Sequence, residues 1–221
     1  MIVTIDGPAG AGKSTVARRL AKRLSFEILD TGAMYRAVTW AALEANINPA
    51  DDNAVSRLTD GLEIQLANER VLVNGRDVSR EVREPRVTAE VSSVADHPTV
   101  RKRMVELQRR IAANGNFVCE GRDQGTVAFP NAQVKIFLTA SVRQRSLRRW
   151  QELCDAGFPE LLEDIERQQT ERDRRDEIRP VGALRRSSDA IDFDTDHLTI
   201  NEVVAELEKI VRRRMTNDNH E

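Results

Sequence analysis

A glycine-rich loop near the start of the chain constrains the fold more than any other segment. Residues 7–14 read Gly-Pro-Ala-Gly-Ala-Gly-Lys-Ser, follow a short apolar run at residues 2–5 and precede a helical pattern that starts near Thr15. The pattern G-x-x-x-x-G-K-S between a strand and a helix predicts a loop whose backbone N–H groups surround phosphates at the helix N-terminus. The segment therefore predicts a nucleoside triphosphate site on an α/β scaffold.

Each residue type in this loop has an expected role. Lys13 should reach the β- and γ-phosphates and act in catalysis, and Ser14 should ligate the Mg²⁺ that binds with ATP. The full set expected to hold ATP is Gly7, Pro8, Ala9, Gly10, Ala11, Gly12, Lys13, Ser14 and Thr15.

Apolar runs separated by helical patterns indicate a parallel sheet flanked by helices. The expected core strands are residues 2–5, 26–29, 117–119, 134–138 and 190–193. Helical patterns are expected near residues 33–46, 84–96 and 98–114, in the late region and at the C-terminus. These elements predict one three-layer α/β domain over residues 1–221.

One stretch interrupts the α/β series and predicts a small antiparallel insert. Residues 62–66 and 71–73 are apolar or alternating around a turn at residues 67–70, and Asn74-Gly75 supplies a second turn before residues 76–78. Asn-Gly between two such runs is typical of a β-hairpin. In a fold of this kind we expect the insert to be a substrate-side flap.

Composition excludes several classes of protein. The 34 basic and 36 acidic residues give a net charge of −2, and aromatic residues are only 4% of the chain, which disfavours a dedicated nucleic-acid binder. Cys119 and Cys154 have no metal-ligand spacing. No apolar run approaches the roughly 20 residues of a membrane span, and the chain opens directly into a strand, so we expect a cytoplasmic monomer without nucleic-acid or membrane partners.

Three polar segments are candidates for a second substrate site. Residues 30–36 and 120–126 each directly follow an expected strand and combine Gly with Arg, and residues 171–179 form a charged segment of the late helical region. In open α/β folds, ligands bind at the carboxyl ends of the parallel strands. We therefore expect the acceptor of the phosphoryl group to bind at this edge.

With these segments in place, the chain resembles the bacterial cytidylate kinases, which are nucleoside monophosphate kinases. The resemblance covers nearly the whole chain and rests on residues 5–14, 30–36, 121–126 with 129–130, 134–138, and 171–173 with 176 and 179. It implies a P-loop fold with a five-stranded parallel sheet. It also implies a core at about 1–35, 115–145 and 188–215, a monophosphate-binding subdomain with the β insert at about 36–114, and a lid at about 146–180.

Site residues follow from the resemblance, position by position. It implies a monophosphate site lined by Thr31, Tyr35, Arg36, Ser92, Arg101, Arg122, Asp123, Arg172, Asp176 and Arg179. Among these, Arg172 and Arg179 are expected to act in catalysis together with Arg148, which resembles a lid arginine as Arg149 does. Thr31 stands where Ser is common, and Thr139 stands where relatives carry Asp, so any role of that acid is lost here.

The implied reaction moves the γ-phosphoryl group of ATP to CMP or dCMP. A phosphate oxygen is already ionised at neutral pH, so in-line transfer needs fixed positive charge and positioning rather than a general base. Two alternatives stay open: a kinase of another acceptor such as UMP, and a regulatory or nucleic-acid-linked NTP-binding protein that uses Arg clusters such as residues 212–214.

Base choice gives a first testable prediction. The cytosine amino group donates a hydrogen bond where uracil has a carbonyl, so a carboxylate at Asp123 favours cytosine. Asp123→Asn should narrow the ratio of kcat/KM for CMP over UMP, because losing a charged partner costs roughly 1.5–3 kcal/mol. Steady-state kinetics with both acceptors measure the ratio, and an unchanged ratio would exclude this role.

Overall fold

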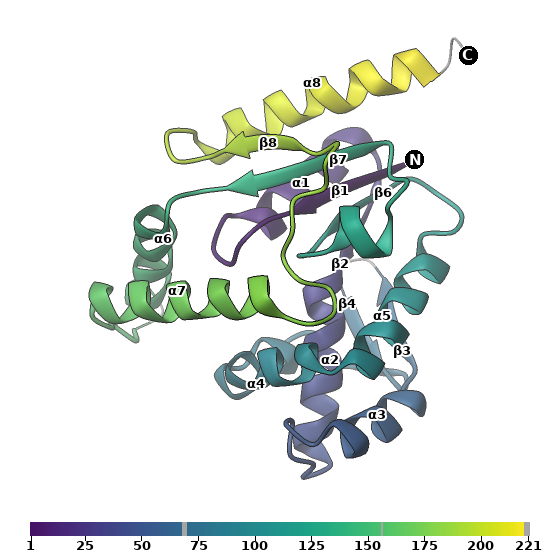
Figure 1. Ribbon diagram of the computed structural model, residues 1–221, viewed down its shortest axis with the longest axis vertical. Coiled ribbons are helices and arrows are strands. Elements are labelled where there is room, and N and C mark those ends of the chain that lie inside the picture. The colour runs from purple at the N-terminus through teal and green to yellow at the C-terminus, as the bar shows by residue number, and fades with distance from the viewer. Residues whose placement is uncertain (68–69, 156, 219–221) are drawn as a thin grey trace. The chain divides into compact units, whose positions relative to one another are not determined.

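The structure is a computed structural model that describes residues 1–67, 70–155 and 157–218. It divides into two compact units (Figure 1). The first comprises Met1–Ile28 and Gly115–Glu221, and the second comprises Leu29–Asn114.

A five-stranded parallel sheet with strand order β2-β6-β1-β7-β8 organises the first unit. Its strands are β1 (Ile2–Asp6), β2 (Glu27–Asp30), β6 (Phe117–Glu120), β7 (Val134–Thr139) and β8 (Ile191–Asp194). Val3 of β1 pairs with Val118 on one side and Val134 on the other, so β1 is the central strand. The five-stranded parallel sheet of the sequence analysis is confirmed.

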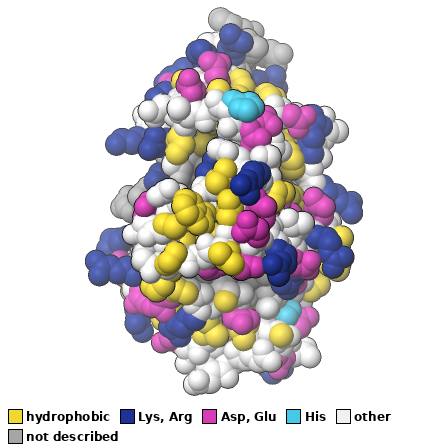
Figure 2. All heavy atoms as spheres, turned by 90° about the vertical axis from the view of Figure 1, so that its left-hand side faces the viewer, with side chains coloured by type: hydrophobic (Ala, Val, Ile, Leu, Met, Phe, Trp, Pro, Cys, Tyr) yellow, Lys and Arg dark blue, Asp and Glu magenta, His cyan; other side chains and the backbone are white. Residues whose placement is uncertain are grey.

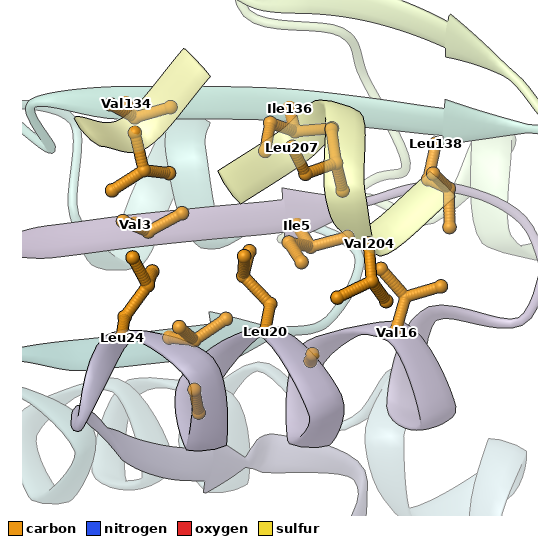
Figure 3. Close-up of a cluster of buried hydrophobic side chains, with 14 of the residues drawn as sticks. Val3, Ile5, Val16, Leu20, Leu24, Val134, Ile136, Leu138, Val204 and Leu207 are labelled. Carbon is orange, nitrogen blue, oxygen red and sulfur yellow. The ribbon is translucent and has the colours of Figure 1, made fainter. Parts of the chain in front are cut away.

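The core of this unit lies between β1, β7 and two helices, α1 (Lys13–Leu24) and α8 (Ile200–Asp218). Apolar residues recur on one face of each helix, which is why both pack on the sheet. Figure 3 shows Leu20 and Leu24 of α1 pointing toward Val3 and Ile5 of β1. This packing holds the N-terminus of α1 directly after the glycine-rich loop.

Three further helical segments complete the first unit. They are the π-helical turn η2 (Gln124–Ala128), α6 (Val142–Asp155) and α7 (Leu162–Ile178). η2 follows β6 and packs against β1, while α6 and α7 pack against each other.

The described residues of the second unit form four α-helices, a 3₁₀ turn and a three-stranded sheet. The helices are α2 (Thr31–Glu44), α3 (Asp52–Asp60), α4 (Pro85–Asp96) and α5 (Pro98–Ile111), with η1 (Glu81–Arg83). The strands are β3 (Ile64–Ala67), β4 (Arg70–Val73) and β5 (Arg76–Asp77), in that order. Helix α2 contacts α3, α4, α5 and β4, so it is the centre of this unit.

The antiparallel insert is confirmed. Ile64 pairs with Val73 and Leu72 with Asp77 in antiparallel register. Asn74 and Gly75 both have positive φ, 49° and 78°, as a tight hairpin turn requires. The turn predicted at residues 67–70 includes residues 68 and 69, which lie outside the described residues.

Two features differ from the sequence predictions. Every predicted core strand extends one residue further toward its C-terminus, onto Asp6, Asp30, Glu120, Thr139 and Asp194. An apolar pattern ends at the last apolar residue, whereas hydrogen bonding continues through the next backbone unit. Helix α3 was not predicted, because its nine residues include few apolar ones, although Asp51 caps it by accepting the Ala54 N–H at 3.0 Å.

The close approach of Gly7 to β7 gives a stability prediction. Gly7 has φ +147°, and a Cβ there would lie 2.0 Å from the Leu138 carbonyl oxygen. Gly7→Ala should therefore lower the free energy of unfolding by roughly 1–3 kcal/mol, as overpacking does. Urea unfolding measures this change.

The matched control is Gly75→Ala, since Gly75 also has positive φ but a Cβ there meets nothing within 4 Å. It carries the backbone strain without the clash, a cost of about 1 kcal/mol. Equal destabilisation by the two variants would show that the contact with β7 is unimportant.

Candidate functional site

The glycine-rich loop joins the central strand β1 to α1. Gly10 and Gly12 have φ of +76° and +88°, values that favour glycine, and α1 begins directly afterward at Lys13. The first N–H groups of a helix have no intrahelical partner, so this end of α1 attracts anions. The predicted strand, loop and helix context is present.

Lys13 is buried beside this loop, and its Nζ donates a hydrogen bond to the Pro8 carbonyl oxygen at 2.6 Å. Burial lowers the pKa of Lys13 to about 7, and the nearby positive charge of Arg122 contributes to this shift. The carboxylates of Glu120 and Asp176 oppose the shift. A bound anion would favour the charged ammonium.

The Ser14 hydroxyl contacts the Glu120 carboxylate. The Ser14 Oγ donates to Glu120 Oε1 at 2.8 Å, and Glu120 is the last residue of β6, the neighbour of β1. A hydroxyl and a carboxylate at the end of a P-loop suit Mg²⁺, which prefers hard oxygen ligands. Among the described residues, no three His, Cys, Asp or Glu side chains gather as a metal-binding group.

Arginines of α6 contact the loop and its surroundings. Arg145 is buried, and its guanidinium donates to the carbonyl oxygens of Ala9 and Ala140, both at 2.9 Å. It also forms a salt bridge of 2.7 Å with Asp173 of α7. Arg145 therefore attaches the glycine-rich loop to both α6 and α7.

The two lid arginines of the sequence analysis lie in different surroundings. Arg148 donates to the Thr195 carbonyl oxygen at 2.9 Å, and its Nη1 lies 3.9 Å from where a Cβ on Gly12 would be. Arg149 pairs with Glu152 of the same helix at 3.2 Å, with both side chains exposed. The structure thus brings Arg148 to the loop and turns Arg149 toward solvent.

Asp176 holds two of the predicted acceptor-site arginines. Its Oδ2 accepts from Arg122 Nε at 2.8 Å and its Oδ1 from Arg179 Nη2 at 2.6 Å. Burial alone would raise the pKa of Asp176, but the charges of Arg122, Arg179 and Arg172 outweigh it and leave this pKa below its usual value. Arg172 lies one helical turn before Asp176 on α7, so the structure brings all four residues together.

The remaining predicted site residue of the first unit, Asp123, is buried at the start of η2. Its carbonyl oxygen accepts the N–H groups of Val127 and Ala128 at 2.8 and 3.1 Å. The backbone of η2 therefore fixes the position of Asp123.

The second unit carries the other predicted residues on α2, α4 and α5. Thr31 and Tyr35 are buried on α2, and the guanidinium carbon of Arg101 lies 5.3 Å from the centre of the Tyr35 ring. Arg36 pairs with Asp30 at 3.3 Å. Ser92 is half-buried on α4.

Arg36 has an additional feature that suits a ligand. Its Nε is buried and has no hydrogen-bond partner among the described residues. A buried donor without a partner is costly, so an anion bound here would satisfy it.

Sequence reasoning placed Glu120 and Asp173 within candidate acceptor segments but gave neither an individual role, and it gave Arg145 no role in the site. A signal for Glu120 exists, since it is a carboxylate directly after an apolar strand at the edge where the loop lies. Arg145 has no local signal, because the carbonyl groups and carboxylate that it binds come from separate segments.

A hollow of about 700 Å³ lies elsewhere on the first unit, between η2 and the segment that follows α7. Its lining includes Thr126, Lys135, Arg185 and Arg186, and it contains none of the predicted site residues.

In the part of the chain that the structure describes, no helix is both long and apolar enough to cross a bilayer.

Lys13 gives a pH prediction. The folded pKa of about 7 lies below the unfolded value of 10.5, so between these pH values the unfolded chain binds more protons. The contribution of Lys13 to the free energy of unfolding should therefore rise with pH, by up to about 1.4 kcal/mol per pH unit. Urea unfolding at pH 7, 8 and 9 should show a gain in the wild type that Lys13→Met lacks.

Lys102→Met serves as the control, because it removes an exposed lysine of the same charge. Its curve should keep the wild-type dependence on pH. Parallel curves for the wild type and Lys13→Met would contradict the lowered pKa.

Comparisons with known proteins identify one family. The cytidylate kinase family model matches residues 3–213. A cytidylate kinase of Carboxydothermus hydrogenoformans is 49% identical over 218 residues, 97% of this chain and 98% of that protein. One of Rhodopirellula baltica is 47% identical over 212 residues, 96% of this chain and 93% of that protein.

Solved structures are similar in fold alone. An uncharacterized protein from Eubacterium ventriosum has a TM-score of 0.55 at 12% identity, covering 96% of this chain and 98% of its own. A shikimate kinase from Bacteroides thetaiotaomicron has a TM-score of 0.50 at 11% identity, with the same coverage. The family match over nearly the whole chain and the identity to the curated relatives show that the chain belongs to the cytidylate kinase family.

Proposed function

We propose that the chain transfers the γ-phosphoryl group of ATP to CMP or dCMP and forms ADP with CDP or dCDP. The observation that carries this proposal is the buried Asp176 that holds Arg122 and Arg179 in the same unit as the phosphate-binding loop. Such a cluster supplies the second phosphate site that a loop for triphosphate alone lacks. Membership of the cytidylate kinase family supports the choice of acceptor.

The donor triphosphate binds residues 7–15 in this proposal. Backbone N–H groups of the loop and the N-terminus of α1 hold its phosphates, and Lys13 contacts the β- and γ-phosphates. Arg148 adds positive charge beside Gly12. Bound phosphate would take the place of the Pro8 carbonyl as the partner of the Lys13 ammonium.

Ser14 would hold Mg²⁺ through its hydroxyl, and Glu120 would hold it through its carboxylate. When bound, the ion neutralises phosphate charge. The residues of this chain do the remaining work, which is to align two anions and to exclude water.

In this proposal, the acceptor is recognised by the residues that the resemblance implies. Arg36, with its unsatisfied Nε, and Arg122 suit the phosphate, while Arg172, Asp176 and Arg179 suit the sugar and phosphate. Ser92, Arg101 and Asp123 would read the base, and Thr31 and Tyr35 complete the site. We assign the second unit, which contains the β insert, to monophosphate binding and residues 146–180 to a lid.

No general base is required for this transfer. The attacking phosphate oxygen of CMP is ionised at neutral pH, and the barrier comes from bringing two anions together. Lys13 and the arginines Arg148, Arg172 and Arg179 supply positive charge that needs no reorganisation during the reaction. Closure of the lid and the second unit would exclude water as a competing acceptor.

We infer a monomeric enzyme that needs no partner besides its two nucleotides. We also infer that it acts in the cytoplasm, where ATP is supplied.

The other functions are less well supported. A UMP kinase would place a carbonyl oxygen against the buried Asp123 carboxylate, which is repulsive. A nucleic-acid-linked NTP-binding protein would need a basic surface, whereas basic and acidic side chains are interspersed on the face drawn in Figure 2.

An ADP-release assay with ATP and Mg²⁺ tests the proposal, with CMP, dCMP, UMP, AMP and GMP as parallel acceptors. We expect strong turnover with CMP and dCMP and weak turnover with UMP, because only cytosine donates to Asp123. Lys13→Met is the negative control.

Turnover only with an acceptor other than CMP or dCMP would support the proposed ATP site and contradict the proposed cytosine site. Absence of turnover that depends on an acceptor, together with a salt-dependent gel shift with RNA or DNA, would favour the binding-protein alternative.

A further inference from the structure

Asp6, the last residue of β1, has a buried side chain that binds the start of η2. Its Oδ1 accepts the Gln124 N–H at 2.9 Å, and its Oδ2 accepts the Gly125 N–H at 2.7 Å. Both oxygens of one carboxylate therefore bind consecutive backbone donors at the beginning of the π-helical turn.

The loop between β6 and η2 is held at both ends by β1. At its beginning, the Gly121 N–H donates to the Ile5 carbonyl oxygen at 3.1 Å, and at its end Asp6 accepts the two N–H groups of η2. Arg122 and Asp123 lie between these two attachments. The position of both side chains thus depends on β1.

Asp6 is also the residue directly before the phosphate-binding loop. The next residue, Gly7, lies so close to β7 that a Cβ would be 2.0 Å from the Leu138 carbonyl oxygen. This contact leaves the backbone at residues 6–7 little room to move. The Asp6 side chain therefore holds the start of η2 from a fixed backbone position.

We propose that Asp6 is a positioning residue that sets the loop carrying Arg122 and Asp123 in register with the phosphate-binding loop. The inference rests on the proposed function, because it takes Arg122 and Asp123 as contacts of the acceptor. Asp6 itself touches neither nucleotide in this proposal and acts through the backbone of Gln124 and Gly125.

The Asp6 carboxylate remains ionised at pH 7.5 although its pKa is raised. Burial raises the pKa of Asp6 to about 6, the two backbone hydrogen bonds oppose this shift, Asp123 adds to it and Lys13 opposes it. The carboxylate is therefore ionised at pH 7.5. Hydrogen bonds to an ionised acceptor are roughly twice as strong as those between neutral groups.

The packing around Gly125 makes the alignment specific. A Cβ on Gly125 would lie 3.0 Å from Thr4 Oγ1 and 3.3 Å from Asp6 Oδ2. The backbone of η2 thus approaches β1 more closely than a residue with a side chain would normally allow.

Asp6→Asn tests the proposal at pH 7.5. The amide keeps one acceptor oxygen and turns an NH₂ group toward the other backbone N–H, so one hydrogen bond is lost. We expect the KM for CMP to rise about 10-fold while the KM for ATP stays within about 2-fold of wild type.

Ile5→Val is the matched control. Ile5 lies on the same strand and is fully buried, and its side chain belongs to the apolar core that β1 forms with α1 and α8. It should leave both KM values within about 2-fold of wild type. A lower kcat with both KM values unchanged in Asp6→Asn, or an equal rise of both KM values, would overturn the proposal.

Amide hydrogen exchange tests the same contact without using activity. In the wild type, the Gln124 and Gly125 amides should exchange as slowly as the paired amides of β1, and Asp6→Asn should accelerate them while Ile5→Val does not. If Asp6→Asn fails to fold, the wild type decides: fast exchange of these two amides overturns the proposal, and slow exchange supports it. A wild type that does not phosphorylate CMP contradicts the proposed function instead and leaves this test intact.

Discussion

The central position of β1 in the parallel sheet is the constraint on which the site depends. Its hydrogen bonds to β6 and β7 bring the ends of three strands to one edge. The glycine-rich loop follows β1, and Glu120 ends β6, so the Ser14–Glu120 contact results directly from the pairing of these strands. The same pairing lets β1 hold both ends of the loop with Arg122 and Asp123.

Binding two phosphorylated nucleotides requires concentrated positive charge. Buried carboxylates of the first unit partly neutralise this charge. Asp176 lies between Arg122 and Arg179, and Glu120 favours the charged form of Lys13. Burial and Arg122 nevertheless lower the pKa of Lys13 to about 7. In the proposed reaction, the substrate phosphates neutralise the positive charge that these carboxylates leave.

The sequence was most informative where a residue's environment is local. The glycine-rich loop, the hairpin turn at Asn74 and Gly75 and the core strands were predictable, because each depends on backbone conformation or on apolar patterning of neighbouring residues. The short helix α3 was missed, since nine residues with few apolar positions resemble a loop. The family and its acceptor followed from the order of several motifs rather than from one of them.

By itself, the sequence determined the α/β class, the triphosphate loop and the set of candidate residues, because strand, loop and helix signals act over a few residues. Only the tertiary structure decided which of them meet. It joined Arg145 to the loop and to Asp173, turned Arg149 toward solvent, and connected Asp6 to a segment more than a hundred residues away in sequence. Such contacts form because the packing of the sheet and its helices brings distant backbone groups within hydrogen-bonding distance, and no local pattern encodes that distance.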